Sequence, residues 1–584
     1  MKPAAIVLLT VAVSTAQSRP PSPALYFQQS NVPIPMRDYV ALRADILRPK
    51  GDGKFPVLVY RTPYGKQSAL KSYTTFRHAV ERGYAVVVQD VRGRYASDGE
   101  FRPYQNEGND GYDTIEWAAR QPWSDGSVGT FGLSYPGAVQ WLAAVENPPH
   151  LKAMVPAMTF STPQNFFYAG GTWDMSWIEW IWDYIAPDAR SKKNLPGPKT
   201  HNQAIAAWPR VGPKMLQVLP LNQLEELRGV APYYYEWLSH PVDDSWWDWC
   251  ELRNKYERAH AAVLNLSAWY DDNYGPEGAT SNFSGLVKTR VGANDRRTHL
   301  LIGPWTHGVE ETAITKAGER EFGPAAAINY DEVVLRWMDR YVRDIDNGVD
   351  REKPVRYFVM GDNQWREADA WPPAAKPTPF YFAGSETTHR GSLRPDTPPE
   401  NDLAPPFISD PAKPVTNPFE SSGAHDYREF AKREDVLTFD SEPLEKEIEV
   451  TGPIQVKIFL SCNCRDLDLW VRLLDVAPEG TAFNLMSPGL DVQRISYRDL
   501  GKGRQLLMPD EIYEVRLENL ITSNVFQKGH RIRTQISASF FSNFSRNLQT
   551  GGLETVSTKI QKARISMYTG KAHPSQIVLP IVPR

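Results

Sequence analysis

Ser134 lies in the sharpest chemical motif of the sequence. The segment Gly129–Ala138 reads GTFGLSYPGA, with a β-like run leading in from Val128 and a helix-like run over Ala138–Val145. A serine in so tight a strand-to-helix turn is raised above the sheet, as in a nucleophile elbow. The second glycine, Gly137, follows the serine by three residues rather than two, so the plain G-x-S-x-G pattern fails. A glycine-rich turn without chemistry is therefore the alternative at this point.

A catalytic serine needs a general base, and the base needs a group that orients it. In the fold that carries such elbows, the acid and then the histidine follow the serine on loops after later strands. Asp271 follows a predicted strand over residues 262–268, and His307 follows one over residues 299–302. Open α/β sheets place their sites at such carboxyl ends of strands. The sequence thus predicts Ser134 as nucleophile, His307 as general base and Asp271 as the orienting acid.

For three further residues, the sequence alone gives a weaker indication of their role at the site. Asp272 adjoins Asp271, and spacing does not decide which of the two carboxylates orients the histidine. The backbone N–H of Tyr135 opens the predicted helix and is placed to stabilise a developing oxyanion. Tyr64 follows a proline turn, and its residue type and position are typical of a core aromatic.

The elements that must position these residues form an α/β domain in the first part of the chain. Short β-branched runs at Val57–Tyr60 and Ala85–Val88 alternate with helical signals, which is typical of a buried parallel sheet with helices on its faces.

Tryptophan-rich helical segments interrupt this pattern and predict a helical cap. A proline-rich stretch and alternating segments follow, and they predict a β-sandwich or jelly roll. The 584 residues exceed what one core usually serves, so several domains are expected. We predict α/β-hydrolase parts at residues 17–158 and 259–350, the cap at 159–258 and the β domain at 351–584.

Composition narrows the classes of partner. Hydrophobic residues make up 41% of the chain and charged residues 23%, which is ordinary for a globular protein. The formal net charge of -4 favours neither nucleic acid nor an anionic membrane as partner. Only three cysteines occur, Cys250, Cys462 and Cys464, with no histidine near the close pair. We therefore expect no disulfide framework, no metal and no cofactor.

The first sixteen residues differ from all that follow. Lys2 supplies a positive charge, Ala4–Val13 is almost wholly apolar, and Ser14–Ala16 is a small-x-Ala cleavage pattern. A buried first strand is the alternative. The run is too short to cross a bilayer, and no later apolar stretch is long enough. We predict a signal peptide over residues 1–16 and a secreted or periplasmic mature protein.

These pieces together resemble a known family. The chain is similar to the X-prolyl dipeptidyl-peptidase-like serine hydrolases, and within them to the cocaine-esterase-type acyl hydrolases. The matching motifs are Arg61-Thr62-Pro63-Tyr64, Asp90-Val91-Arg92-Gly93-Arg94, Gly132-Leu133-Ser134-Tyr135-Pro136-Gly137, Trp269-Tyr270-Asp271, Gly303-Pro304-Trp305-Thr306-His307, Thr451-Gly452-Pro453-Ile454 and Phe544-Ser545-Arg546-Asn547. The resemblance spans essentially the whole mature chain. It implies an α/β-hydrolase domain with an inserted helical cap and a C-terminal β jelly-roll domain.

The resemblance also assigns roles at the site. It favours Asp271 over Asp272 as the acid, and it implies that the Tyr64 phenol joins the Tyr135 N–H in the oxyanion hole. A tyrosine with an ordinary pKa near ~10 stays protonated at neutral pH and can donate that hydrogen bond. The aromatic cap fits a hydrophobic acyl chain, although helices also bury tryptophans against each other. We expect Trp173, Trp177 and Trp269 to bind substrate.

Three activities occur among such proteins: hydrolysis of bulky acyl esters or amides, release of X-Pro dipeptides, and hydrolysis of α-amino acid esters or β-lactams. The last group holds the substrate ammonium with acids two and three positions past the catalytic Asp, and here these positions are Asn273 and Tyr274. Both are neutral, so we expect neutral esters to be better substrates than matched α-amino esters. An X-Pro exopeptidase must hold a free N-terminus, which acids of the cap could do (Asp174, Asp183, Asp243 and Asp244). Ester hydrolysis leads, and a small-molecule ester, amide or peptide is the expected partner.

Two further alternatives remain. A secreted carbohydrate-binding protein, with the elbow as a relic, is the hypothesis from another class. Arg92, Arg94 and Asp98 form a charged loop after a predicted strand, which could bind a substrate carboxylate. The interpretation that we favour for this loop is an internal ion-pair network.

Overall fold

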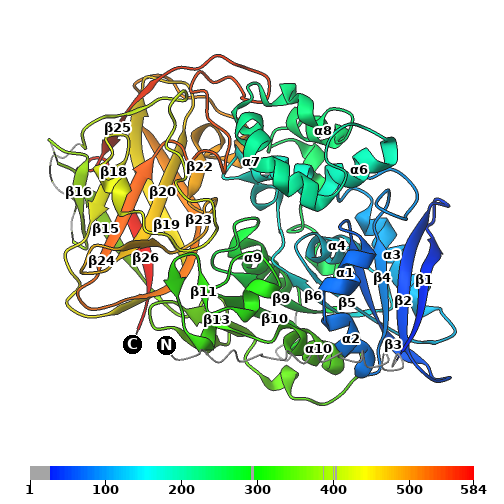
Figure 1. The fold of residues 1–584 in the computed structure, drawn as a ribbon. Coiled ribbons are helices and arrows are strands. Elements are labelled where there is room, and N and C mark those ends of the chain that lie inside the picture. The colour runs from blue at the N-terminus through cyan, green and yellow to red at the C-terminus, as the bar shows by residue number, and fades with distance from the viewer. Residues whose placement is uncertain are drawn as a thin grey trace, which may run out of the picture.

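The computed structural model describes residues 26–290, 295–385, 387–396, 398, 400 and 404–583. It contains two large β-sheets side by side, each in its own domain, with a group of helices above the first (Figure 1). The predicted signal peptide at residues 1–16 lies outside the described residues. Within them, no helix is both long and apolar enough to cross a membrane.

The first sheet has ten strands in the order β1-β2-β4-β3-β5-β6-β9-β10-β13-β14. The strands from β4 to β13 in this order run parallel, and antiparallel strands flank them on both sides. Their bounds are β1 (Tyr26–Pro35), β2 (Ala41–Pro49), β3 (Phe55–Thr62), β4 (Ala85–Asp90), β5 (Ser124–Leu133), β6 (Leu151–Ala157), β9 (Ala262–Ala268), β10 (Thr298–Gly303), β13 (Val355–Val359) and β14 (Gln364–Ala368).

Helices cover both faces of this sheet, which explains its apolar strands. Val57 and Val59 of β3 belong to the core under α3 and α4, whereas Leu58 and Tyr60 belong to the core under α2 and α10. Successive residues of a strand point to opposite faces, so a strand that is buried on both sides must be apolar throughout. The helices are α1 (Lys66–Ser72), α2 (Thr75–Glu81), α3 (Glu107–Ala119), α4 (Tyr135–Ala144), α9 (Gly275–Thr289) and α10 (Tyr330–Tyr341). The predicted α/β-hydrolase architecture is confirmed.

A largely helical segment separates β6 from β9 and lies over the sheet as the cap (Figure 1). Phe167 is near its centre, where its ring contacts the rings of Trp173, Trp177, Trp237 and Trp247. The main elements are β7 (Tyr168–Ala169), β8 (Thr172–Trp173), α5 (Ser176–Trp180), the π-helical turn η2 (Ile181–Ile185), α6 (Ala186–Lys193), α7 (His201–Gln217) and α8 (Pro232–Ser239). Most of the tryptophans of the cap thus pack against other aromatics.

The last part of the chain is a β domain with twelve strands, at the left of Figure 1. Its helices, in the described residues, are short 3-10 turns, and its core contains apolar residues of most strands. The strands are β15 (Lys376–Ala383), β16 (Arg390–Arg394), β17 (Phe407–Ser409), β18 (Leu437–Asp440), β19 (Ile448–Cys462), β20 (Asp468–Val476), β21 (Ala482–Asn484), β22 (Val492–Arg494), β23 (Tyr513–Phe526), β24 (Arg531–Ser537), β25 (Ala563–Tyr568) and β26 (Gln576–Val582). A C-terminal β-rich domain is confirmed, while the domain boundaries given above stay predictions.

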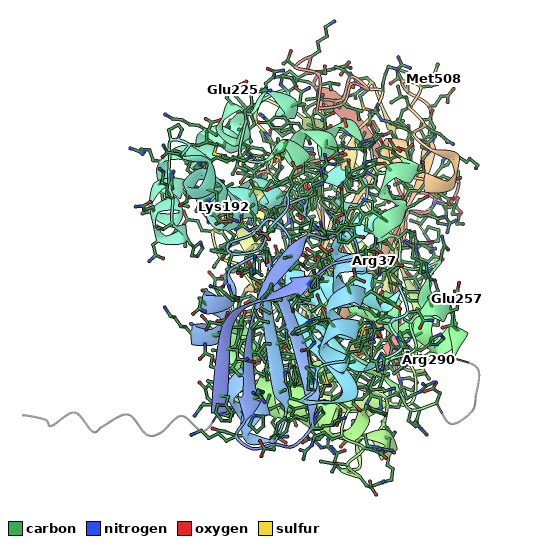
Figure 2. The ribbon with its side chains drawn as sticks, turned by 90° about the vertical axis from the view of Figure 1, so that its right-hand side faces the viewer. Arg37, Lys192, Glu225, Glu257, Arg290 and Met508 are labelled. Carbon is green, nitrogen blue, oxygen red and sulfur yellow. A yellow bond between two sulfur atoms is a disulfide. The ribbon has the colours of Figure 1, made fainter. Side chains whose placement is uncertain are left out.

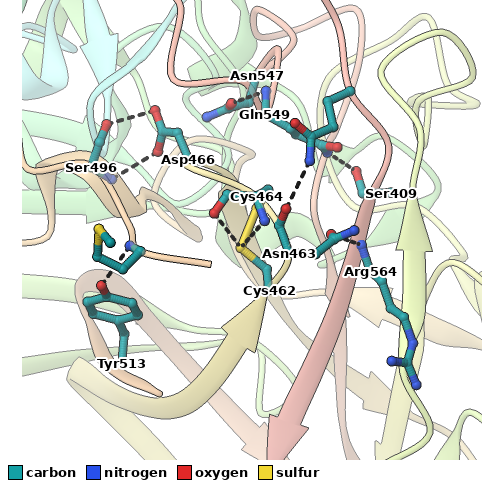
Figure 3. Close-up of a disulfide and its surroundings, with 12 residues drawn as sticks. Ser409, Cys462, Asn463, Cys464, Asp466, Ser496, Tyr513, Asn547, Gln549 and Arg564 are labelled. Atoms are coloured by element: carbon teal, nitrogen blue, oxygen red, sulfur yellow. Dashed lines mark hydrogen bonds between the residues drawn. A yellow bond between two sulfur atoms is a disulfide. The ribbon is translucent and has the colours of Figure 1, made fainter. Parts of the chain in front are cut away.

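Cys462 and Cys464 form a disulfide, which we did not expect (Figure 3). The expectation rested on the odd count of three cysteines, whereas pairing depends on the local backbone: β19 ends at Cys462 and the chain turns there. Side-chain and backbone groups of Asn463 bond to Arg564 and Gln561 at this turn, and the two sulfur atoms meet across it. Cys250 is buried and free. Among the described residues, no group of three or more His, Cys, Asp or Glu side chains could hold a metal.

Candidate active site

Ser134 occupies a strained turn between β5 and α4. Its backbone has φ 68° and ψ -127°, a region that residues other than glycine rarely adopt. A Cβ on Gly132 would lie 2.5 Å from Pro136 Cβ, and a Cβ on Gly137 would lie 2.6 Å from the Ala157 carbonyl oxygen. Both glycines are therefore required by close packing. The second one lets α4 approach β6, which accounts for its place three residues after the serine.

Tyr135 contributes its backbone to the site and its side chain to the core. As the first residue of α4, it carries one of the N–H groups that have no partner within the helix. Its phenol is fully buried and donates to Glu107 Oε1 at 2.7 Å, and its ring stacks on Tyr104. Glu107 in turn pairs with Arg61 at 2.8 Å. These buried contacts fix the position of the N–H that is placed to meet an oxyanion.

His307 and Asp271 meet on the loops after β10 and β9. His307 Nδ1 donates to Asp271 Oδ1 at 2.8 Å, and the Asp271 side chain has no exposed surface. The same oxygen accepts the backbone N–H groups of Asn273 at 3.1 Å and Tyr274 at 3.4 Å. Hydrogen bonds of this kind stabilise the charged form of a buried carboxylate. Ser134 and His307 line the same cleft, and Asp271 is bonded to His307 behind it.

Asp272 has a different partner from Asp271. Its carboxylate accepts a hydrogen bond from the Ser422 hydroxyl of the β domain. The geometry therefore selects Asp271 as the residue that orients His307. Burial lowers the pKa of His307, but the charges of Asp271, Asp272 and Glu310 and the hydrogen bond to Asp271 outweigh it, so that the pKa is raised.

Tyr64 lines the cleft beside Ser134, and the two side chains interact. Burial raises the pKa of its phenol far above the ordinary value, and the Trp180 and Ser134 side chains oppose this only in part. Its oxygen accepts the Trp180 indole N–H at 3.0 Å. Because an indole can only donate, the phenol proton of Tyr64 is free to be donated elsewhere. Tyr274 brings a second phenol to Ser134, and burial raises its pKa as well.

The three tryptophans that we expected to bind substrate do not line the cleft. Trp173 and Trp177 are buried among the rings of the cap, and the Trp177 indole donates to the Phe166 carbonyl. Trp269 is buried at the junction with the β domain, where its indole donates to Phe358 O at 2.7 Å and its ring packs on Trp371. The tryptophan that lines the cleft is Trp180. Tryptophans three and four residues apart in a helix share one apolar face, so spacing could not separate core from cleft.

The charged loop after β4 forms an internal network, as favoured above. Arg92 pairs with Asp38 and Asp110. Arg94 is buried, and its guanidinium donates to three backbone carbonyls at 2.9 Å: Pro63 before Tyr64, and Tyr184 and Ile185 of the cap. Arg94 thus joins the cap to the turn that carries Tyr64.

The cleft has a volume of about 1580 Å³ and lies between sheet and cap. The sheet loops supply Tyr64, Ser134 and His307, and the cap supplies Glu179, Trp180 and Asp183. Sequence reasoning missed Trp180 and Glu179, and it named Tyr274 only as a neutral position beyond the acid. A strained serine in a strand-to-helix turn and a histidine bonded to a buried carboxylate, both lining one cleft, define a serine hydrolase of the α/β-hydrolase fold.

Comparison with known proteins places the chain in a family. Residues 38–309 match the X-Pro dipeptidyl-peptidase (S15 family) model, and residues 347–578 match its C-terminal non-catalytic domain. The chain is 33% identical to the cocaine esterase of Rhodococcus sp. (strain MB1 Bresler), covering 96% of this chain and 99% of that one. The chain belongs to the X-Pro dipeptidyl-peptidase-like serine hydrolases, in the group that includes cocaine esterase.

Solved structures agree on the fold. An α-amino acid ester hydrolase superposes with a TM-score of 0.80 at 24% identity, covering 98% of this chain and 100% of that one. A CocE/NonD family hydrolase from Staphylococcus aureus superposes with a TM-score of 0.68 at 22% identity, covering 95% and 94%. Both comparisons show the α/β-hydrolase sheet with a separate β-rich domain.

The charges around His307 predict a pH profile. The base must be neutral, so kcat/KM for a neutral ester should fall as the pH drops through the pKa of His307, with an inflection above the ordinary ~6.5. Asp272→Asn removes one of the charges that raise this pKa and should move the inflection down by roughly half a pH unit. Asp331→Asn is the control, because that cleft carboxylate pairs with His78 instead. An inflection that stays in place in an active Asp272→Asn enzyme would contradict this electrostatic account.

Proposed function

We propose that Ser134, His307 and Asp271 hydrolyse carboxylic esters through an acyl-enzyme. Ser134 Oγ attacks the ester carbonyl while His307 takes its proton, and the Tyr64 O–H and Tyr135 N–H donate to the oxyanion. His307 then gives the proton to the departing alcohol. A water molecule, deprotonated by His307, attacks the acyl-enzyme and releases the acid. The hydrogen bond of 2.8 Å between His307 and the buried Asp271 carries this proposal.

Esters of bulky acyl groups are the substrates that we favour, with amides as a slower class. The cleft is large and aromatic on its cap side, where Trp180 and Tyr184 lie. The residues two and three past the acid, Asn273 and Tyr274, offer hydrogen bonds but no charge to an α-amino group. A buried ammonium without a partner costs several kcal/mol. Release of X-Pro dipeptides and hydrolysis of α-amino esters or β-lactams are therefore the second choices, and a carbohydrate-binding role is the most distant.

Two substitutions test the roles of the serine and the phenol. Ser134→Ala should lower kcat by at least ~10³, because the hydroxyl begins the covalent step. Tyr64→Phe removes one oxyanion donor, so kcat should fall by ~10²–10³ while KM changes little. Steady-state kinetics with a neutral aryl ester measures both effects, and binding of a fluorophosphonate probe should be lost only in Ser134→Ala. If Ser134→Ala keeps most of the activity, the mechanism is wrong. A raised KM at unchanged kcat would make Tyr64 a ground-state contact.

We further propose that the protein is exported and that its C-terminal β domain is a jelly roll. The apolar run and the small-x-Ala pattern in Met1–Ala16 support export. The mature N-terminus of protein purified from its native host should therefore be Gln17 or a residue close to it. N-terminal sequencing measures this directly, and an intact Met1 would refute the proposal.

The jelly-roll proposal for the C-terminal β domain is supported by its sheet, which pairs strands that are distant in the chain, such as β19 and β26.

A further inference from the structure

Arg94 joins separate segments of the chain although it is almost wholly buried. Only 1% of the residue is exposed, and it is not among the described residues that line the cleft. A guanidinium presents five N–H donors in one rigid plane. Its Nε donates to Pro63 O, and its Nη1 and Nη2 donate to Ile185 O and Tyr184 O, each at 2.9 Å. The turn before Tyr64 and the end of the cap turn η2 are therefore held at one fixed separation.

A tight loop after β4 determines where this guanidinium lies. Gly93 has φ 70°, and a Cβ on it would lie 2.2 Å from the backbone nitrogen of Phe101. Val91 N donates to Thr62 O at 3.0 Å, which ties the start of the loop to the end of the neighbouring parallel strand β3. The loop is thus anchored to the sheet, and Arg94 reaches the cap from a fixed backbone.

The cap holds the same loop from its own side. Lys192 of α6, labelled in Figure 2, donates to Gly93 O at 2.8 Å. Asp188 of α6 accepts the backbone N–H of Tyr95 at 3.1 Å and pairs with the Arg94 guanidinium at 3.3 Å. A buried charge is tolerated when it is paired and hydrogen-bonded, and here the cap supplies the partner. The loop and the cap therefore hold each other at several points.

Tyr64 is contacted by both of the segments that Arg94 joins. Its backbone follows directly on Pro63, whose carbonyl accepts from Arg94. Its oxygen accepts the Trp180 indole N–H at 3.0 Å, and its ring packs against the Tyr184 ring at 5.4 Å. The position of the phenol therefore depends on one guanidinium in two ways, through its own backbone and through the cap residues that touch its ring and oxygen.

The position of an oxyanion donor affects the rate more than it affects binding. Such a donor stabilises charge that develops only in the transition state, so it must lie within hydrogen-bond distance of the place where that charge forms. A displacement of about 1 Å can cost about 10²-fold in rate. The side chains of Tyr64 and Ser134 interact, so the phenol lies beside the nucleophile.

We infer that Arg94 is a positioning residue for the Tyr64 phenol, and that it makes the rate of hydrolysis depend on how the cap is docked. This inference rests on the proposed ester hydrolysis at Ser134 and on the proposed role of Tyr64 as an oxyanion donor. The guanidinium does not line the cleft, so it acts through Tyr64 and not on the substrate. Its loss should therefore lower kcat and leave KM nearly unchanged.

A double-mutant cycle tests the inference. Arg94→Lys keeps a cation, but one ammonium cannot reproduce the planar set of three hydrogen bonds. In the native background, kcat for a neutral aryl ester should fall by about 10- to 100-fold, with KM changed by less than about threefold. In the Tyr64→Phe background the phenol O–H is already absent, so Arg94→Lys should change kcat by less than about threefold. Each kcat is divided by the concentration of sites titrated with a fluorophosphonate, so misfolded protein does not count.

Arg37→Lys is the matched control. Arg37 is an exposed arginine between β1 and β2, and it pairs with Asp113 of α3 at 2.9 Å rather than with the cap (Figure 2). The same arginine-to-lysine change at this position should leave kcat and KM unchanged in both backgrounds.

A second variant keeps the test decisive if Arg94→Lys does not fold. Lys192→Met removes a partly exposed ammonium that bonds to Gly93 O, so it weakens the same link without a change in the core. In the native background it should lower kcat by about two- to tenfold, which is the scale of one lost hydrogen bond. In the Tyr64→Phe background it should have no effect on kcat.

Each outcome decides a different claim. An unchanged kcat in Arg94→Lys, equal falls in the two backgrounds, or an effect confined to KM would overturn the inference alone. If Arg94→Lys cannot be prepared, an unchanged kcat in Lys192→Met overturns it. If Tyr64→Phe leaves kcat unchanged, no phenol needs positioning and the inference also fails. Hydrolysis that persists in Ser134→Ala would instead defeat the proposed function.

Discussion

The geometry of the cleft depends on one buried charge, the carboxylate of Asp271. A charge with no exposure is tolerated only when it is paired and hydrogen-bonded. His307 and two backbone N–H groups bond to its Oδ1, and the neighbouring backbone holds the arrangement. Trp269 N donates to Gly303 O at 2.8 Å and Tyr270 N donates to Trp305 O at 3.0 Å. The loop with the acid is thereby tied to the loop with the histidine, because both follow neighbouring parallel strands.

The β domain braces this same acid loop, which gives it a structural reason to accompany the hydrolase domain. The Tyr270 phenol donates to Asn484 O at 2.9 Å, Ser487 N donates to Trp269 O at 3.3 Å, and Ser422 bonds to Asp272. Successive residues of one loop are thus held by a second domain. On the opposite side of the cleft, Arg94 holds the turn before Tyr64 against the cap. The loop with Asp271 and the turn before Tyr64 are both positioned by elements outside the central sheet.

Local sequence predicted the parts of the site whose chemistry depends on position along a strand. Ser134, Asp271 and His307 each follow a strand of the parallel sheet, so strand pattern and chain order were enough to predict their place at the carboxyl ends of the strands. The choice of Asp271 over Asp272 needed the resemblance, because both carboxylates have the same spacing. Tyr64 also needed it, since an aromatic after a proline turn is ordinary in a core.

The cap could not be predicted at the same level of detail. Trp177 and Trp180 lie three residues apart in α5, and this spacing does not show which of them is buried among other rings and which lines the cleft. For this reason Trp173 and Trp177 were expected in the cleft where Trp180 lies, and Glu179 escaped notice. The disulfide was missed for a similar reason, because the strand end at Cys462 decides the direction of the next side chains. Tertiary contacts, rather than periodicity, determine each of these positions.

The central claim is that a covalent acyl group forms on Ser134 under the control of the His307–Asp271 pair. The most direct measurement is mass spectrometry of the protein quenched with acid during turnover of a slow aryl ester, followed by digestion. The account predicts an added mass equal to the acyl group on the peptide that contains Ser134, and its loss when Ser134 is replaced by alanine. An acyl group on another peptide, or turnover with a rapid release of the aryl alcohol but no adduct on Ser134, would contradict it.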